Sequence, residues 1–81
     1  MHELAAAQDV VRVAVQAAKE QNARRITAIA LKVGSAYAAE QLRDLIAIAA
    51  QGTIAEGARL DVEAVSGSAI QVASIDIESI E

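Results

Sequence analysis

The chain has 81 residues, of which 54% are hydrophobic and 22% charged, so it suits one small globular domain and is too apolar to be disordered. It contains no cysteine, which excludes disulfides, thiolate zinc sites and cysteine nucleophiles, and its net charge of −4 disfavours nucleic acid as a partner. No apolar run is long enough to span a bilayer and no secretory signal opens the chain, so we expect a cytoplasmic protein that does not bind membranes.

The first half of the chain predicts a helix, a strand and a second helix. Residues 3–22 form a helix that stops at Asn22, and its buried face repeats every three or four residues: Leu4, Ala7, Val11, Ala14, Val15 and Ala18. Over residues 25–33 the period changes to two, which places Thr27, Ile29, Leu31 and Val33 on one face of a strand and Ile26, Ala28, Ala30 and Lys32 on the other. A second helix follows over residues 38–51 and ends before a left-handed Gly52, with a buried face of Leu42, Leu45, Ile46 and Ala49.

The second half predicts two strands joined by a short turn. Residues 59–64 alternate charged and apolar side chains, as a half-exposed strand does, and residues 66–68 form a turn of small residues. The last strand, over residues 69–77, is expected to pair back as a hairpin. Its apolar phase slips near Ala73, which indicates either a bulge there or two partly buried faces. The order αβαββ predicts an α+β domain, with two helices on one face of a three-stranded mixed sheet and the other face left for a partner or solvent.

The chain lacks the sequence motifs of the common enzyme classes. It has one histidine, and its glycines, at positions 34, 52, 57 and 67, form neither a P-loop nor a dinucleotide fingerprint. The acidic pairs Asp61/Glu63 and Asp76/Glu78 are read as solvated sheet surface. We therefore expect a protein that is not an enzyme.

The amino terminus has distinctive metal chemistry. The amine of Met1, a backbone amide of His2 or Glu3, and the His2 imidazole can close chelate rings in one plane around a metal ion. Planar nitrogen ligation selects Ni²⁺ or Cu²⁺ and requires a free amino terminus. The residues alone do not distinguish nickel from copper, and the alternative is a terminal histidine with no function.

Four segments carry a resemblance to the HypA/HybF family of nickel-insertion accessory proteins for nickel–iron hydrogenase and, in some organisms, urease. They are the opening Met1-His2-Glu3-Leu4, Lys32-Val33-Gly34, Gly52-Thr53-Ile54-Ala55-Glu56-Gly57-Ala58 and the closing Ser74-Ile75-Asp76-Ile77-Glu78. The resemblance implies a nickel-binding α+β domain, with a zinc ribbon of two CxxC motifs inserted between the last two strands.

The resemblance also implies roles for individual residues. His2 matches the nickel ligand, with the Met1 amine and the amides of His2 and Glu3 as co-ligands, and the Glu3 side chain matters for nickel or partner recognition. Glu40 falls where some members place a carboxylate near the metal, although a glutamate in a first helical turn is also explained by the helix dipole. The implied partner is the maturation GTPase HypB, to which nickel would pass by ligand exchange.

The sequence departs from the family pattern at three points, and the missing zinc ribbon and a second apolar stripe suggest an alternative function. The zinc ribbon is missing from the expected single domain, 1–81, because the turn at 66–68 stands in its place, and Ser35 replaces a common acidic residue. A second apolar stripe on the helices predicts a homo-oligomer interface: Ala6, Val10, Val13, Ala17 and Ile48. The alternative is therefore a structural assembly subunit, natural or engineered, that keeps the scaffold and delivers no metal. The alanines of the stripe are also explained without a partner, because alanine favours a helix wherever it stands.

Overall fold

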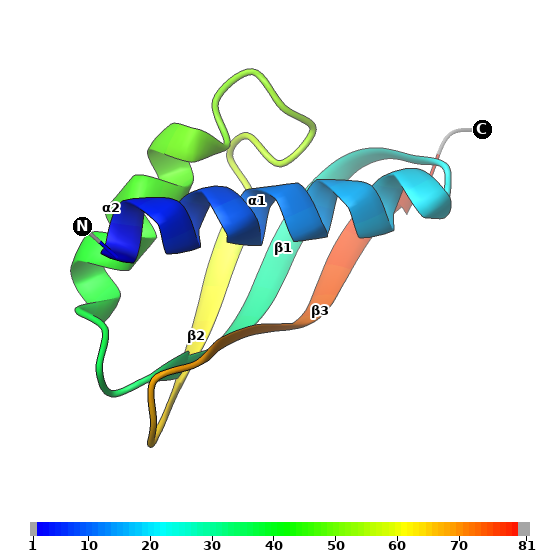
Figure 1. Ribbon diagram of the computed structural model, residues 1–81. Helices are drawn as coiled ribbons and strands as arrows, with labels where there is room; N and C mark the ends of the chain where they lie inside the picture. The colour runs from blue at the N-terminus through cyan, green and yellow to red at the C-terminus, as the bar shows by residue number, and fades with distance from the viewer. Residues whose placement is uncertain (1, 80–81) are drawn as a thin grey trace.

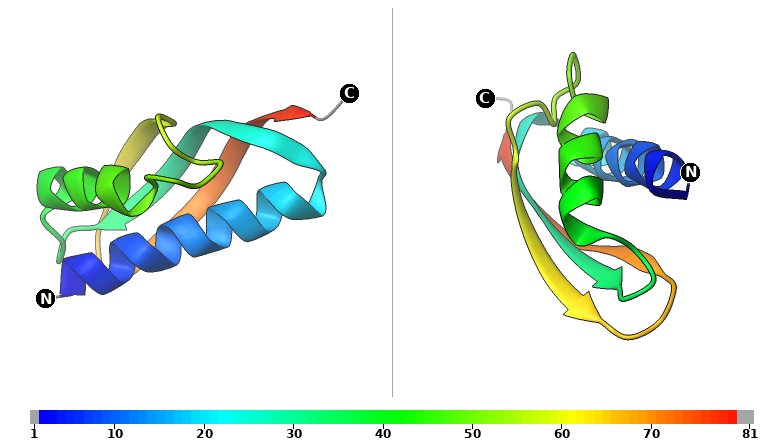
Figure 2. Two further views of the ribbon diagram at one scale, coloured as in Figure 1. Left: turned by 90° about the horizontal axis from the view of Figure 1, so that it is seen from above. Right: turned by 90° about the vertical axis from the view of Figure 1, so that its left-hand side faces the viewer.

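The computed structural model describes residues 2–79 of the chain, and the side chains of residues 3–79. The elements follow the predicted order αβαββ (Figure 1). Their bounds are α1 His2–Glu20, β1 Ala23–Gly34, α2 Ala39–Ala49, β2 Arg59–Val65 and β3 Ile70–Ser79. Both helices lie on one side of the sheet (Figure 2). The predicted α+β class and its mixed three-stranded sheet are confirmed for the described residues. No helix among these residues is both long and apolar enough to cross a membrane.

Charged residues and left-handed backbone positions mark the ends of the helices. Glu3 lies in the first turn of α1 and Lys19 in the last, as the helix dipole favours. The chain then leaves α1 through Asn22, whose φ of 57° is left-handed, as expected for a helix stop. After α2, Gly52 is also left-handed, with a φ of 80°.

The segment 52–58, which carries much of the family resemblance, is a loop held by its own side chains. Thr53 Oγ1 donates to the Ala50 carbonyl at 2.7 Å and accepts from the Ala55 N–H at 3.0 Å. The Gly52 N–H donates to Glu56 Oε1 at 3.1 Å. These contacts fold the loop so that Ala55, 1% exposed, joins the core. Its residue pattern is therefore explained by structure.

The strand order is β2-β1-β3, so the predicted hairpin between the last two strands is wrong. β1 pairs in parallel with β2 and antiparallel with β3. The physical reason is burial, because β1 is the most apolar strand and takes the centre, while the more polar β2 and β3 take the edges. The 66–69 connection carries the chain across the end of β1.

This crossing requires Gly34. The Gly34 N–H donates to the Ala69 carbonyl at 2.8 Å, and the Ala36 N–H donates to the Gly67 carbonyl at 3.1 Å. A Cβ on Gly34 would lie 2.5 Å from the Gly67 carbonyl oxygen. A side chain at position 34 would therefore force the crossing segment away from β1.

The register between β1 and β3 shifts at three places, and two of these shifts concern residues near the centre of the sheet. Val72 pairs with Leu31 and Ser74 with Ala30, so Ala73 is the extra residue of a bulge, which is the first of the two predicted explanations of the phase slip. The register also shifts between Ile26 and Ala28. As a result Ile26 joins the same core as Ile29, Leu31 and Val33, and the prediction that it lies on the opposite face is wrong.

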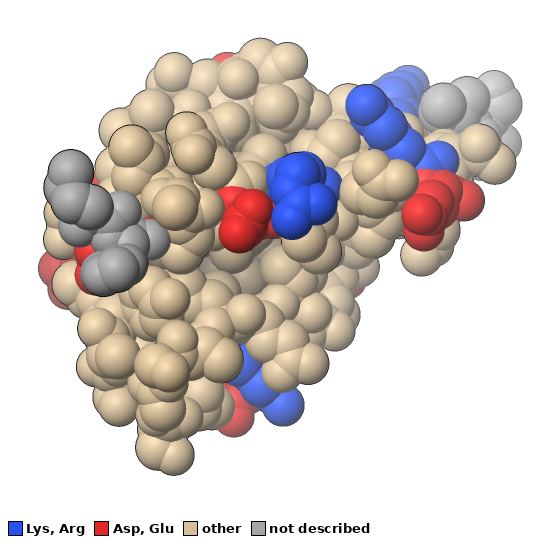
Figure 3. Space-filling model, viewed as in Figure 1, with Lys and Arg blue, Asp and Glu red and all other residues tan. Residues whose placement is uncertain are grey.

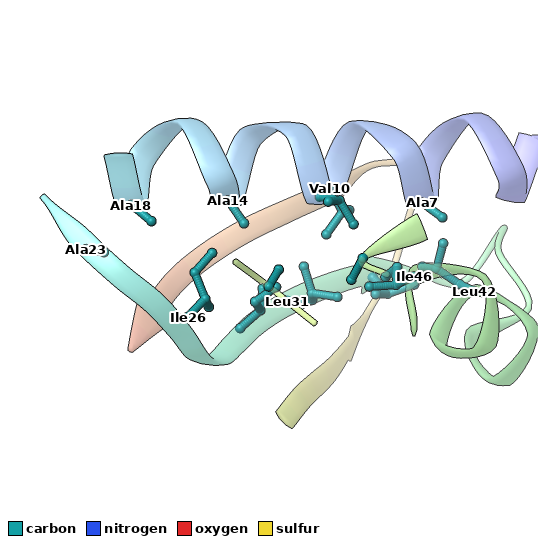
Figure 4. Close-up of a cluster of buried hydrophobic side chains, with 14 residues drawn as sticks. Ala7, Val10, Ala14, Ala18, Ala23, Ile26, Leu31, Leu42 and Ile46 are labelled. Atoms are coloured by element: carbon teal, nitrogen blue, oxygen red, sulfur yellow. The ribbon is translucent and has the colours of Figure 1, made fainter. Parts of the chain in front are cut away.

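Small residues let α1 pack closely on the sheet (Figure 4). Ala7, Ala14 and Ala18 are each 0% exposed and face the large side chains of β1 and α2, of which Ile26, Ile29, Leu31, Leu42 and Ile46 are the most deeply buried. Leu4 is predicted on this face but is 49% exposed, whereas Val10 is 4% exposed and belongs to the core. Val10 is buried because it lies three residues after Ala7 and four before Ala14 on the same helix face.

The uncovered face of the sheet carries a charged pair. Arg59 Nε and Nη2 donate to the carboxylate of Asp61 at 3.0 to 3.2 Å, with both side chains more than half exposed. The hydrogen bond from Arg59, with the charges of Arg59 and Arg43, holds the pKa of Asp61 below its ordinary value. An exposed pair of this kind adds little to stability.

Replacing Gly34 by alanine should destabilise the fold by about 1–3 kcal/mol, because the new methyl group overlaps the backbone of residues 67 and 69. Urea unfolding of both proteins measures the difference. The control is Gly52→Asn, since a Cβ at position 52 would have no atom within 4 Å and asparagine tolerates the left-handed backbone there. Equal stability of Gly34→Ala and the parent would contradict the role assigned to this contact.

Replacing Arg59 by glutamine should raise the pKa of Asp61 toward its ordinary value, as measured by NMR titration of the carboxyl carbon. Because the folded-state pKa is lowered, the pair stabilises the fold above the unfolded pKa, and this contribution is lost as the pH falls through the folded one. Arg12→Gln is the control, since Arg12 pairs with Asp9 on α1. A shift of the Asp61 pKa in that variant would contradict the assignment.

Candidate metal centre

The predicted chelate lies at the edge of the described residues. Met1 and the His2 side chain, which would supply the amine and the imidazole, fall outside them. The backbone of His2 begins α1. The surroundings of the site are therefore defined by Glu3 and the elements that it contacts.

Glu3 ties the start of α1 to the start of α2. Its Oε2 accepts a hydrogen bond from the Ala38 N–H at 3.5 Å, the upper limit for such a bond. Ala38 precedes α2, and its methyl side chain cannot cap the helix. The half-buried carboxylate of Glu3 thus serves an orphan donor at the end of a helix 35 residues away in sequence.

A small hollow of about 250 Å³ adjoins this contact and is lined by Glu3, Ala36, Tyr37 and Ser68. The Tyr37 N–H donates to the Gly34 carbonyl at 3.1 Å, and Ala36 is bonded to Gly67, so the loop is held against the chain crossing. The beginning of α1, the loop before α2 and the 66–69 crossing therefore meet at one place. Sequence reasoning did not select Tyr37 or Ser68; the usable signal was that Tyr37, the sole aromatic residue, follows Gly34 closely.

The carboxylates do not make a metal site by themselves. Glu40 is exposed in the first turn of α2, two residues after Ala38, and it does not line the hollow. Within residues 2–79 as described, no group of three histidine, cysteine, aspartate or glutamate side chains could hold a metal ion.

The residues predicted to form an oligomer interface do not form one continuous exposed stripe. Val10 lies in the core, and Ala6 and Ala17 are half-buried. Val13 on α1 is 41% exposed and Ile48 on α2 is 60% exposed. Among the described residues, the large hydrophobic side chains that are exposed are Leu4 and Val13 on α1 and Ile48 on α2.

Comparison with known proteins identifies the family that the chain matches. The family model described as "Hydrogenase/urease nickel incorporation, metallochaperone, hypA" matches residues 1–75. The chain is 36% identical over 64 residues to hydrogenase maturation factor HypA of Archaeoglobus fulgidus, covering 76% of this chain and 58% of that protein. It is 43% identical over 67 residues to the HypA of Chloroflexus aurantiacus, covering 80% and 59%, and 41% identical over 69 residues to that of Chlorobaculum tepidum, covering 83% and 61%.

The matched region thus spans about three fifths of each of these relatives. A metallochaperone binds and transfers a metal without catalysing a reaction, so the family also confirms the prediction that the chain is not an enzyme. Because the family model covers nearly the whole length and the relatives agree with it, the chain belongs to the HypA family of hydrogenase and urease nickel-incorporation metallochaperones.

Proposed function

We propose that this chain binds Ni²⁺ at its amino terminus and hands it on during hydrogenase maturation. Family membership supports the cargo and the process. The observation that supports the proposal is the position of Glu3, which lies in the first turn of α1, within 3.5 Å of the Ala38 nitrogen before α2, and lines the hollow. A chelate that follows directly from a helical turn packed against α2 has fewer directions open to it than one on an isolated terminus.

The proposed ligands are the Met1 amine, the backbone amides of His2 and Glu3, and the His2 imidazole. Four nitrogens in a plane suit the d⁸ Ni²⁺ ion. Cu²⁺ competes for the same ligands, because in the general order of divalent-metal affinity copper binds more tightly than nickel. Supply of nickel by the maturation pathway would then decide which metal is carried. Amine, amide and imidazole must all lose protons to bind, so nickel affinity falls as the pH is lowered.

Glu3 acts in this proposal as the residue that positions the chelate. Its amide nitrogen is a ligand, while its carboxylate contacts the Ala38 N–H rather than being reserved for the metal. Glu40, in the first turn of the same α2 helix, is the second candidate carboxylate. A carboxylate at either position would add negative charge near a bound cation.

The proposed recipient of the nickel is a HypB-like maturation GTPase, with transfer by ligand exchange. The β2–β3 connection at 66–68 would stand where the family carries its zinc ribbon, so transfer would rely on the α+β domain and not on zinc.

Self-association through the helices is the second candidate function. Exposure of Val13 and Ile48 favours it, and sedimentation of the metal-free protein over a range of concentrations tests it.

Nickel titration of the untagged protein should show one bound ion per chain with the visible absorption of planar Ni²⁺. His2→Ala and acetylation of the Met1 amine should each abolish it, because each removes a nitrogen from the plane. Gln8→Ala, an exposed position on the same helix, is the control and should bind as the parent does. A spectrum that resembles hydrated Ni²⁺ in the parent protein would contradict the proposal.

Glu3→Ala should weaken nickel binding by about tenfold, because loss of a residue that orients a metal ligand typically has that size of effect. Glu3→Gln keeps an acceptor for the Ala38 N–H and should restore most of the affinity. Competition calorimetry measures both variants, with Glu40→Gln alongside. If Glu3→Gln fails as completely as Glu3→Ala, then Glu3 acts through its charge, and if Glu40→Gln weakens binding more, then Glu40 is the metal-proximal carboxylate.

A further inference from the structure

A groove of about 710 Å³ runs between α1 and the beginning of β3. The surface there is hollowed and mostly uncharged (Figure 3). Val10 and Val13 line it from the helix, and Ile70 and Val72 line it from the strand. Tyr37 and Ser68 line both this groove and the hollow beside Glu3, so the two openings are neighbours. The groove is thus a surface that the proposed metal site does not use.

One wall of the groove is a strand edge with free hydrogen-bonding groups. The order β2-β1-β3 leaves the outer side of β3 without a neighbouring strand among the described residues. The Gly34 N–H donates to the Ala69 carbonyl, and antiparallel pairing alternates, so Gln71 is the next residue directed at β1. The N–H and C=O groups of Ile70 and Val72 therefore point to the outer edge, beside the groove.

The charged side chains that β3 itself carries are all acidic. Asp9 lines the groove, and its contact with Arg12, at 3.3 Å, is fully at the surface. Farther along, β3 carries Asp76 and Glu78, and Ile70–Ser79 contains no lysine or arginine, although Glu78 lies 3.7 Å from the exposed Arg24 of β1. Pairing of β3 with the β3 of a second copy would therefore bring two acidic strands together, whereas a basic strand would be complementary.

We propose that the groove binds an extended, basic segment of a partner protein, which adds to the outer edge of β3 as a fourth strand. The backbone of the segment pairs with Ile70 and Val72, and its alternate apolar side chains lie between α1 and β3. A helix seated in the groove would leave the edge donors and acceptors unpaired. An extended segment uses both the apolar groove and the strand edge, and its intervening lysine or arginine side chains would lie beside the acidic side chains of β3.

The test uses a synthetic peptide of about eight residues that alternates valine and lysine, long enough to pair along the described part of the edge. The protein is kept free of metal, so the outcome does not depend on nickel binding. Added peptide should slow hydrogen exchange at the Ile70 and Val72 amides in NMR spectra. An isomer with its valines in one block should bind at least about tenfold more weakly, because its apolar side chains no longer share one face.

Two variants locate the binding surface. Val13→Lys should weaken peptide binding by about tenfold or more, because it removes an apolar wall and adds a like charge, and Val13→Ser should weaken it less. Ile48→Lys is the matched control, since Ile48 is an exposed apolar residue on α2 that does not line the groove. Urea unfolding confirms that each variant is folded; Val13 is already 41% exposed, so little stability should be lost.

Three results would overturn the proposal. The first is peptide binding without slower exchange at Ile70 and Val72, which would mean that the edge is not used. The second is an equal effect of Val13→Lys and Ile48→Lys. The third is protection of these amides in the free protein that grows with protein concentration, with a dimer in sedimentation, which would make a second copy the occupant.

Discussion

The close backbone contact at Gly34 determines how the second half of the chain is arranged. Two hydrogen bonds, from the Gly34 N–H and the Ala36 N–H, hold residues 67 and 69 against the end of β1, in space that a side chain would fill. The chain can therefore pass from β2 on one side of β1 to β3 on the other. Both the hollow beside Glu3 and the groove beside β3 are bordered by this crossing, through Ser68 and its neighbours.

The alanine-rich first helix is the second constraint. Alanine supplies 20 of the 81 residues, and the three that α1 buries completely present only methyl groups to the sheet. The helix can therefore approach β1 closely, and isoleucine and leucine side chains from β1 and α2 provide most of the buried apolar volume. This packing also directs the amino-terminal end of α1 toward α2, where Glu3 reaches Ala38 (Figure 1).

The two candidate surfaces suggest a division of tasks. The chelate at the amino terminus would hold the metal, and the groove would hold a strand from another protein a short distance away, since Tyr37 and Ser68 border both openings. A partner segment seated in the groove would bring its own metal ligands close to the carried ion. Transfer by ligand exchange needs such proximity, because donor and acceptor ligands must bind the ion at the same time.

Much of the architecture was predictable from local patterns. Period-3.6 and period-2 spacing located the helices and strands, the phase slip near Ala73 located a bulge, and Asn22 and Gly52 marked left-handed positions. The Met1-His2-Glu3 start and the segment 52–58 indicated the family. These features are encoded in short stretches because dihedral preferences, turn residues and side-chain periodicity act between near neighbours.

Long-range packing, which no local pattern specifies, determines which strands are neighbours and which side chains are buried. β3 pairs with β1 and not with β2, Ile26 shifts into the core through a register change, and Val10 is buried where a surface stripe was expected. The Glu3–Ala38 contact and the groove join residues far apart in the sequence, from elements whose meeting no local pattern specifies. Helix periodicity shows which residues share a face, but the width of the buried face depends on how closely the sheet approaches, which here follows from alanine packing and the Gly34 crossing.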